Sequence, residues 1–261
     1  MIKLFRNIRQ KLVAEGKTTN YLKYAIGEII LVMIGILLAL QVNNWNEQRK
    51  NKHIEYEMLS DLKSDLEETN KDILDDIEGN QFFLNSTLNI QRHILENLTF
   101  HDSLIMDFDI MTQQTTLFEK SSAYESLKSS GLNIISNNKI KKEITDFFNL
   151  KLARAQSTSK LSFNEIFMPY LEKHFDVNLD ATLMQYWYEG GNRPKGSLAK
   201  GNLPGYVPLD YVSLKSDPKF SIILRNAINA RINIIGRYTS TSKSIDNLIN
   251  LIDDELKTMK N

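Results

Sequence analysis

Serines that are followed three positions later by a lysine are the residues whose type and spacing come closest to a catalytic pattern. Such segments include Ser157-Thr-Ser-Lys160, Ser216-Asp-Pro-Lys219 and Ser240-Thr-Ser-Lys243. In serine acyl-transfer enzymes such a pair supplies the nucleophile and a nearby base, and a Lys-Thr-Gly element accompanies it. No Lys-Thr-Gly element follows here. The spacing therefore predicts no acyl-transfer site.

Metal-binding patterns are equally incomplete. Asp176, Asn178 and Asp180 begin like a calcium-binding loop, but Ala181 replaces its turn glycine and Trp187 its twelfth-position acid. The four histidines lack metal-binding spacing, and the absence of cysteine excludes disulfides, thiolate nucleophiles and zinc–thiolate sites. We expect no catalytic, cofactor-binding or metal site, and therefore a protein that is not an enzyme.

A largely apolar run from Leu22 to Val42 is the strongest feature of the chain, interrupted by Lys23 at its start and then by Gly27, Glu28, Gly35 and Gln41. As a helix it would reach about 31 Å, which matches the hydrocarbon core of a bilayer. A cleaved signal peptide would have a shorter apolar core followed by small residues, whereas bulky polar residues follow this run. We expect an uncleaved signal anchor, with a transmembrane helix at residues 24–45 in the lipid bilayer.

The charges on either side of this run indicate its orientation. Six bases and one acid lie before it or at its start, namely Lys3, Arg6, Arg9, Lys11, Lys17, Lys23 and Glu15. The bases that follow it are diluted by acids, so the positive-inside rule places residues 1–23 in the cytoplasm and residues 46–261 in the periplasm. Such a basic end suits an anionic inner-membrane leaflet better than nucleic acid. Residues 2–14 form either an amphipathic helix on the cytoplasmic surface or a frayed basic tail.

Three residues inside the apolar run are candidate contacts with a membrane partner. Glu28 could bond a partner helix or carry a proton, or it could reach the nearby interface without any function. Gly35 and Ala39 lie four residues apart, a spacing that lets two helices approach closely but is common by chance. The partner would be a second copy or another membrane or periplasmic protein.

The remaining chain predicts an all-α fold, an antiparallel bundle of long helices with coiled-coil-like periodicity. Helices are expected at residues 46–98, 103–130 and 139–175. The last would be capped by Asn137 or Asn138 and bent or broken near Pro169, and a fourth begins with the cap Asp217 and Pro218. In the first of them, leucine and isoleucine recur every eleven residues, close to the period of a straight helix. No stretch shows sustained period-two alternation, so little or no sheet is expected.

A glycine- and proline-rich stretch at residues 186–211 predicts a long loop. Unstructured connections of this length are uncommon in compact domains and often bind something. Aromatic and basic side chains alternate in the stretch, so its binding candidates are Trp187, Arg193, Lys195, Lys200 and Tyr206. The alternative is a plain connection whose aromatic residues hold it against the bundle.

Two blocks resemble a known family. The first is Tyr24-Ala-Ile-Gly-Glu-Ile-Ile-Leu-Val-Met-Ile-Gly-Ile-Leu-Leu-Ala-Leu-Gln-Val-Asn-Asn-Trp-Asn-Glu47, and the second is Ala123-Tyr-Glu-Ser-Leu-Lys-Ser-Ser-Gly131 followed by Asn133-Ile-Ile-Ser-Asn137. Both are similar to segments of an uncharacterised family of single-span membrane proteins typical of Bacteroidota, catalogued as a domain of unknown function. The resemblance implies a membrane anchor with a helical outer domain and supplies no activity.

Taken together, these patterns favour a non-enzymatic, inner-membrane-anchored periplasmic protein for interaction or sensing. The alternative is an accessory subunit of a transport or proton-driven membrane complex that acts through Glu28. No cofactor and no nucleic acid are expected in either case.

Overall fold

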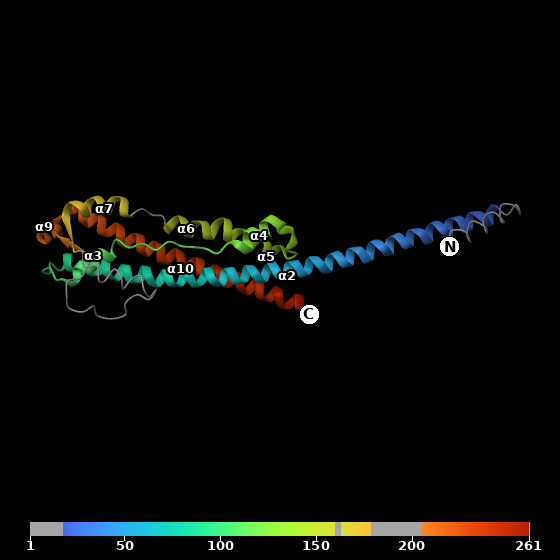
Figure 1. Ribbon diagram of the computed structural model, residues 1–261, viewed down its shortest axis with the longest axis horizontal. Coiled ribbons are helices and arrows are strands. Elements are labelled where there is room, and N and C mark those ends of the chain that lie inside the picture. Colours follow the sequence, from blue (N-terminus) through green and yellow to red (C-terminus); the bar gives the residue numbers. More distant parts are fainter. Residues whose placement is uncertain (1–17, 160–162, 179–204, 261) are drawn as a thin grey trace. The chain divides into compact units, whose positions relative to one another are not determined.

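The computed structural model describes residues 18–159, 163–178 and 205–260 of the chain (Figure 1). The chain divides into two compact units, Met1–Glu57 and Met58–Asn261. The helix α2 (Thr18–Leu95) contributes residues to both of them. Most of the predicted cytoplasmic segment and most of the loop at residues 186–211 lie outside the described residues.

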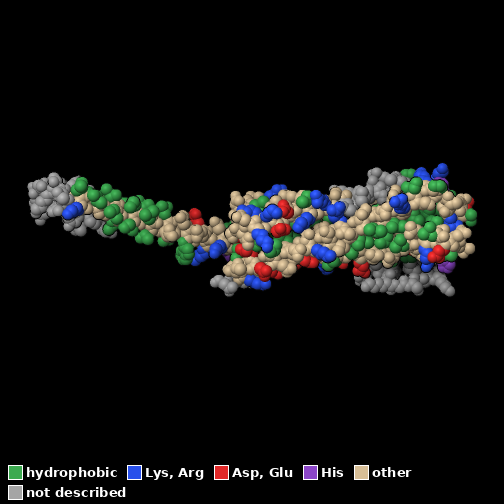
Figure 2. Space-filling view, turned by 180° about the vertical axis from the view of Figure 1, so that it is seen from behind, with side chains coloured by type: hydrophobic (Ala, Val, Ile, Leu, Met, Phe, Trp, Pro, Cys, Tyr) green, Lys and Arg blue, Asp and Glu red, His purple; other side chains and the backbone are tan. Residues whose placement is uncertain are grey.

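The first unit contains the apolar part of α2. Its large hydrophobic side chains are exposed to between 45% and 67% of their surface from Leu22 to Trp45, and they cover the part of the helix visible in Figure 2. Among the described residues, this is the one helix long and apolar enough to cross a membrane. Just beyond the run, the guanidinium of Arg49 lies 5.9 Å from the ring centre of Trp45.

In the second unit, α2 runs antiparallel to α10 (Pro218–Lys260), as expected for a bundle of long helices (Figure 1). Lys63 forms an ion pair with Asp253 at 2.7 Å, and the side-chain amide of Asn70 donates to Asp246 at 2.9 Å. The predicted start of α10 is confirmed, because Asp217 precedes the first turn and its carboxylate accepts from the backbone amide of Lys219 at 2.8 Å. Proline at the first helical position costs no hydrogen bond.

The remaining elements are short. They are α3 (Ser103–Ile110), α4 (Ser122–Ser130), the 3-10 turn η1 (Leu132–Ile134), α5 (Asn138–Asp146), the π-helical turn η2 (Phe147–Leu152), α6 (Ala153–Ser159), α7 (Phe163–His174), β1 (Phe175–Asn178), β2 (Gly205–Pro208) and α9 (Tyr211–Ser216). The predicted cap at Asn137 is confirmed, since its side chain accepts from the backbone amides of Lys139 and Ile140.

One local expectation was wrong, since the helix expected at residues 103–130 is two helices separated by residues 111–121. Proline at position 169 lies inside α7, so the helix is not broken there. The expectation of little or no sheet is confirmed, because the described residues form one small antiparallel sheet, in which β1 and β2 pair Phe175 with Pro208 and Asn178 with Gly205. The fold class is all-α, as predicted.

The main core lies where α2, α3, α7 and α10 meet. Aromatic rings fill its centre: Phe108 lies 5.0 Å from Phe175 and 6.1 Å from Phe220, measured between ring centres. Burying rings of this size stabilises the fold by about 2–3 kcal/mol for each side chain. The β1–β2 pair closes this end of the core, because Phe175 of β1 is a core residue and Tyr206 of β2 packs against the core.

Candidate functional site

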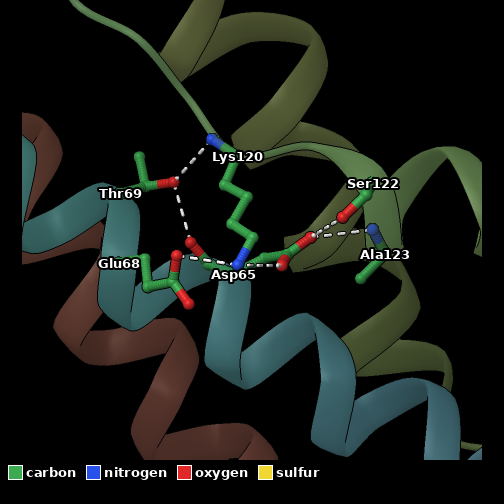
Figure 3. A network of polar contacts seen from close by, with 6 residues as sticks. All are labelled: Asp65, Glu68, Thr69, Lys120, Ser122 and Ala123. Atoms are coloured by element: carbon green, nitrogen blue, oxygen red, sulfur yellow. Dashed lines mark hydrogen bonds and ion pairs between the residues drawn. The ribbon is translucent and has the colours of Figure 1, made fainter.

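Asp65 is the centre of the most extensive polar network among the described residues of the second unit (Figure 3). It lies on α2 and is only 6% exposed. One carboxylate oxygen accepts from the backbone amide of Ala123 at 2.8 Å and from the hydroxyl of Ser122 at 2.9 Å. Ser121 occupies the N-cap position of α4 but makes no side-chain cap bond. Asp65 therefore caps α4 from a different helix, with its negative charge at the positive end of the α4 dipole.

Lys120 connects this cap to the next turn of α2. Its ammonium group lies 2.7 Å from Glu68 and 3.8 Å from Asp65, while its backbone amide donates to the hydroxyl of Thr69 at 3.0 Å. Thr69 in turn donates to the backbone carbonyl of Asp65 at 2.8 Å. The hydrogen bond and ion pair with Glu68 raise the pKa of Lys120, so this lysine is charged and cannot serve as a base at neutral pH.

Residues 113–121, which we call the strap, run along α2 in the opposite direction. Thr115 accepts from the side-chain amide of Asn80 at 2.7 Å, and at the other end Ser122 bonds Asp65. From Asp65 to Asn80, fifteen residues of helix span about 22 Å. Their partners Ser122 and Thr115 are seven residues apart, so the strap covers the same distance at about 3.2 Å per residue, the rise of a strand. The strap is therefore extended.

Side chains of the strap alternate between buried and exposed. Thr115 is 9% exposed and Leu117 is 4% exposed, whereas Phe118 is 73% exposed. The backbone amide of Phe118 donates to Asp72 of α2 at 3.3 Å, so the backbone that carries this ring is held in place. A large aromatic side chain that remains in solvent on a fixed backbone is suited to contact a partner.

Arg231 of α10 holds the beginning of the strap. It is 3% exposed, donates to the carbonyl oxygens of Met111 (3.3 Å) and Gln113, and lies 5.0 Å from the ring centre of Phe83. It also reaches the side-chain oxygen of Asn80 at 3.4 Å. Burial lowers the pKa of Arg231 to about 10, which still leaves it charged at neutral pH. The cation is thus engaged in positioning the strap.

Beside the capped end of α4 lies a hollow of about 340 Å³. It is lined by Met58, Asp61, Ser64, Asp65, Lys120, Ser122, Ala123 and Ser126. Ser122 donates to the carboxylate of Asp65, which also accepts from the backbone amide of Ala123, and Lys120 is paired with acids. The described residues contain no group of three or more His, Asp or Glu that could hold a metal ion. The arrangement can accept hydrogen bonds and cations.

A second hollow, of about 290 Å³, lies between α7 and α9. Here the hydroxyl of Tyr170 donates to Asp217 at 2.6 Å, and the ring stacks on His174 with centres 4.3 Å apart. Burial, together with the hydrogen bond to Asp217, raises the pKa of Tyr170. The same bond lowers the pKa of Asp217. These contacts tie α7 to the first turn of α10, so their role is structural.

Four of the predicted site residues, Glu28, Gly35, Ala39 and Tyr206, lie in described parts of the chain. Glu28, Gly35 and Ala39 lie in the apolar part of α2, and nothing lies within 4 Å of the position that a Cβ would take on Gly35. Tyr206 lies on β2 and packs against the core, and burial raises its pKa. The other loop candidates, Trp187, Arg193, Lys195 and Lys200, lie outside the described residues.

The sequence does not reveal the Asp65 network, because Asp65 is more than fifty positions away from its partners Lys120, Ser122 and Ala123. One signal pointed at it, since the second resembling block begins at Ala123, whose amide Asp65 caps.

Comparison with known proteins assigns a family. A model of DUF6090, a family of unknown function, matches residues 28–164, which is more than half of the chain. The chain belongs to this family. No curated protein and no solved structure gave a match. The DUF6090 match contains the apolar run after Glu28, Asp65, the strap and α4, whereas Arg231 and the rest of α10 lie outside it. The capped strap is therefore part of the DUF6090 region itself.

Proposed function

We propose that this DUF6090 protein is anchored in the inner membrane by the apolar part of α2 and binds another protein in the periplasm without catalysing a reaction. The observation that carries the anchor is the exposure of its apolar side chains: Leu22, Leu31 and Val42 are all more than half exposed. At about 25 cal/mol per Å² of apolar surface, leaving such a segment in water is strongly unfavourable, and lipid would cover it.

The ends of the apolar run support the orientation. Basic residues predominate before it, and Trp45 with Arg49 stands just after it. Tryptophan is enriched at membrane interfaces, where its ring meets the headgroups. With the amino terminus in the cytoplasm, the second unit would be periplasmic.

The proposed binding surface consists of Phe118 and the hollow beside Asp65. The exposed ring would provide apolar contact area, and Asp61 with the serines of the hollow would provide polar contacts. The chemistry of the hollow supports binding rather than catalysis, since Ser122 is bonded to the carboxylate of Asp65 and Lys120 to that of Glu68.

The proposal is tested by crosslinking in intact cells. A photoreactive amino acid is placed at Phe118 in the full chain, and the adducts are identified by mass spectrometry, with the same probe at exposed Lys142 of α5 as the control. The proposal expects one defined protein adduct at position 118 that is absent at position 142. Equal, diffuse labelling at both positions would contradict it.

A second candidate function is an accessory subunit of a transport or proton-driven complex. It is supported by the acidic side chain of Glu28 within the apolar run and by the open space over Gly35. The test is co-purification of a multi-span protein in mild detergent, followed by the substitutions Glu28→Gln and Gly35→Ile. Unchanged recovery of the complex in both variants would remove this candidate.

A further inference from the structure

One exposed face of α10 carries an unusual row of asparagines. Asn226, Asn229, Asn233, Asn247 and Asn250 follow one another at intervals of three, four, fourteen and three residues. Between Asn233 and Asn247, Gly236, Ser240 and Lys243 continue the same alternation of three- and four-residue intervals. Residues spaced in this way form a single stripe on a helix. Every member is exposed, and we call this row the asparagine stripe.

The stripe is not a typical solvated helix face. Exposed helix positions are usually filled by good helix formers such as Glu, Lys and Ala, whereas asparagine and glycine weaken a helix. Within the described residues, the five asparagine side chains make no hydrogen bond. Gly236 has nothing within 4 Å of the position that a Cβ would take. The composition therefore weakens α10, and the described part of the chain makes no side-chain hydrogen bond to these asparagines that would compensate for it.

Around residues 226–243 of the stripe the charges are all positive, and Asp246, the one acid within the span of the stripe, accepts a hydrogen bond from Asn70 of α2. Arg225 and Arg237 flank it and Lys243 lies in it, while no acid occurs between Asp217 and Asp246. Within residues 18–159, 163–178 and 205–260, these three bases form no ion pair. Arg225 and Lys243 are five helical turns apart and so lie on the same side, separated by about 27 Å. Two apolar side chains, Ile222 (60% exposed) and Ile232 (52% exposed), lie beside them.

We propose that the asparagine stripe is the docking face for an acidic α-helix of a partner protein. The three-four spacing is that of the seam between two packed helices, and the small side chains at Gly236 and Ser240 allow close approach. Asparagine amides provide both donors and acceptors across such a seam. The unpaired bases select acidic side chains on the flanks of the incoming helix. This inference rests on the proposed function, and it adds that the binding face is the asparagine stripe and that the partner segment is an acidic helix.

A second copy of the chain packed in parallel fits this face poorly, because Lys243 would face its own counterpart and like charges in contact destabilise an interface. A second copy packed antiparallel would bring Asp246 toward Arg225, and a crosslink between two copies of α10 would reveal it. The bases Arg225, Arg237 and Lys243 favour an acidic helix of a different protein.

The experiment places a photoreactive amino acid at Asn229 or at Gly236 of the full chain in intact cells. Both sites are exposed, so neither probe disturbs the core. The adduct is digested, and the crosslinked peptide of the partner is sequenced. The measurement is repeated with Arg225→Glu combined with Arg237→Glu, and with Lys71→Glu combined with Lys139→Glu as a control of equal charge change on exposed helix positions.

The expected result is an adduct to an acidic helical segment of another protein. The Arg225→Glu, Arg237→Glu pair should reduce it by about tenfold or more, and the control pair should leave it unchanged. Replacing the partner's acids by lysine should then restore the adduct. An adduct to a second copy, to lipid or to a non-acidic segment, or equal adducts in both charge-reversed variants, would overturn the inference. If the probe at Phe118 captures a partner while those at Asn229 and Gly236 capture none, this inference fails and the proposed function stands.

Discussion

The carboxylate of Asp65 accepts a hydrogen bond from the backbone amide of Ala123 at 2.8 Å, although the two residues belong to different helices and are 58 positions apart. Through this bond α2 supplies the cap that the local sequence before α4 lacks. It also fixes the carboxyl end of the strap, and Arg231 fixes the beginning. The position of the exposed ring of Phe118 depends on both.

Replacing Asp65 by alanine should therefore destabilise the second unit. The change leaves the buried backbone amide of Ala123 without an acceptor, whereas the exposed hydroxyl of Ser122 can bond water, so the free energy of unfolding should fall by about 1–3 kcal/mol. Urea unfolding of the full chain in mild detergent measures it, and hydrogen exchange should show the largest increase in α4. The control Asp61→Ala removes an exposed acid from the same hollow and should cost less than about 0.5 kcal/mol. Equal costs for the two variants would contradict the cap.

Two neighbouring residues of the strap should respond in opposite ways. Leu117→Ala removes a buried side chain and should cost about 2–4 kcal/mol, whereas Phe118→Ala should change stability by less than about 0.5 kcal/mol. The same unfolding measurement distinguishes them. If Phe118→Ala were the more costly change, the strap would not have the alternation described above.

Gly205 has a backbone conformation that only glycine adopts easily. Its φ is +143°, and a Cβ would collide with the carbonyl oxygen of Ile105. We expect Gly205→Ala to destabilise the protein by at least about 2 kcal/mol. The matched control Gly236→Ala lies in open space within α10, where alanine should stabilise the helix by about 0.5–1 kcal/mol. Thermal unfolding of the two variants should therefore shift in opposite directions.

Asp109 of α3 provides a test that depends on pH. Burial raises the pKa of its carboxyl, and the hydrogen bond from Gln113 offsets this only partly. Between the unfolded value of 3.8 and the raised value, the folded state binds more protons than the unfolded state, so stability increases as the pH falls through the folded-state pKa. Asp109→Asn should thus stabilise the protein at pH 7, and its advantage should disappear below pH 4. An advantage that is constant from pH 7 to pH 3 would show that the carboxyl is not desolvated.

Local signals in the sequence predicted local structure well. Asp217 before Pro218 and Asn137 before α5 cap the helices that they were expected to start, because a cap depends only on the adjacent residues. The strap could not be predicted in this way. The backbone amides of Phe118 and Lys120 donate to Asp72 and Thr69 of α2, which are about fifty positions away in the sequence.

The eleven-residue repeat of α2 predicts which side chains are buried only where the same elements pack against the helix. Leu62, Ile73 and Leu84 are buried as expected, but Leu88 is 39% and Leu95 is 77% exposed. Near its carboxyl end, α2 packs against α3 and the core around Phe108, which buries Ile90 instead. The periodicity alone does not reveal where neighbouring elements begin and end.

The most direct test of the account is a topology measurement on the full chain. Alkaline phosphatase and green fluorescent protein are fused separately after Asn261, and the membranes of both strains are extracted with alkaline carbonate. The account predicts an active phosphatase, a dark fluorescent protein and a chain that stays in the membrane pellet. A fluorescent fusion with inactive phosphatase, or release of the chain into the supernatant, would contradict a periplasmic binding unit anchored by α2.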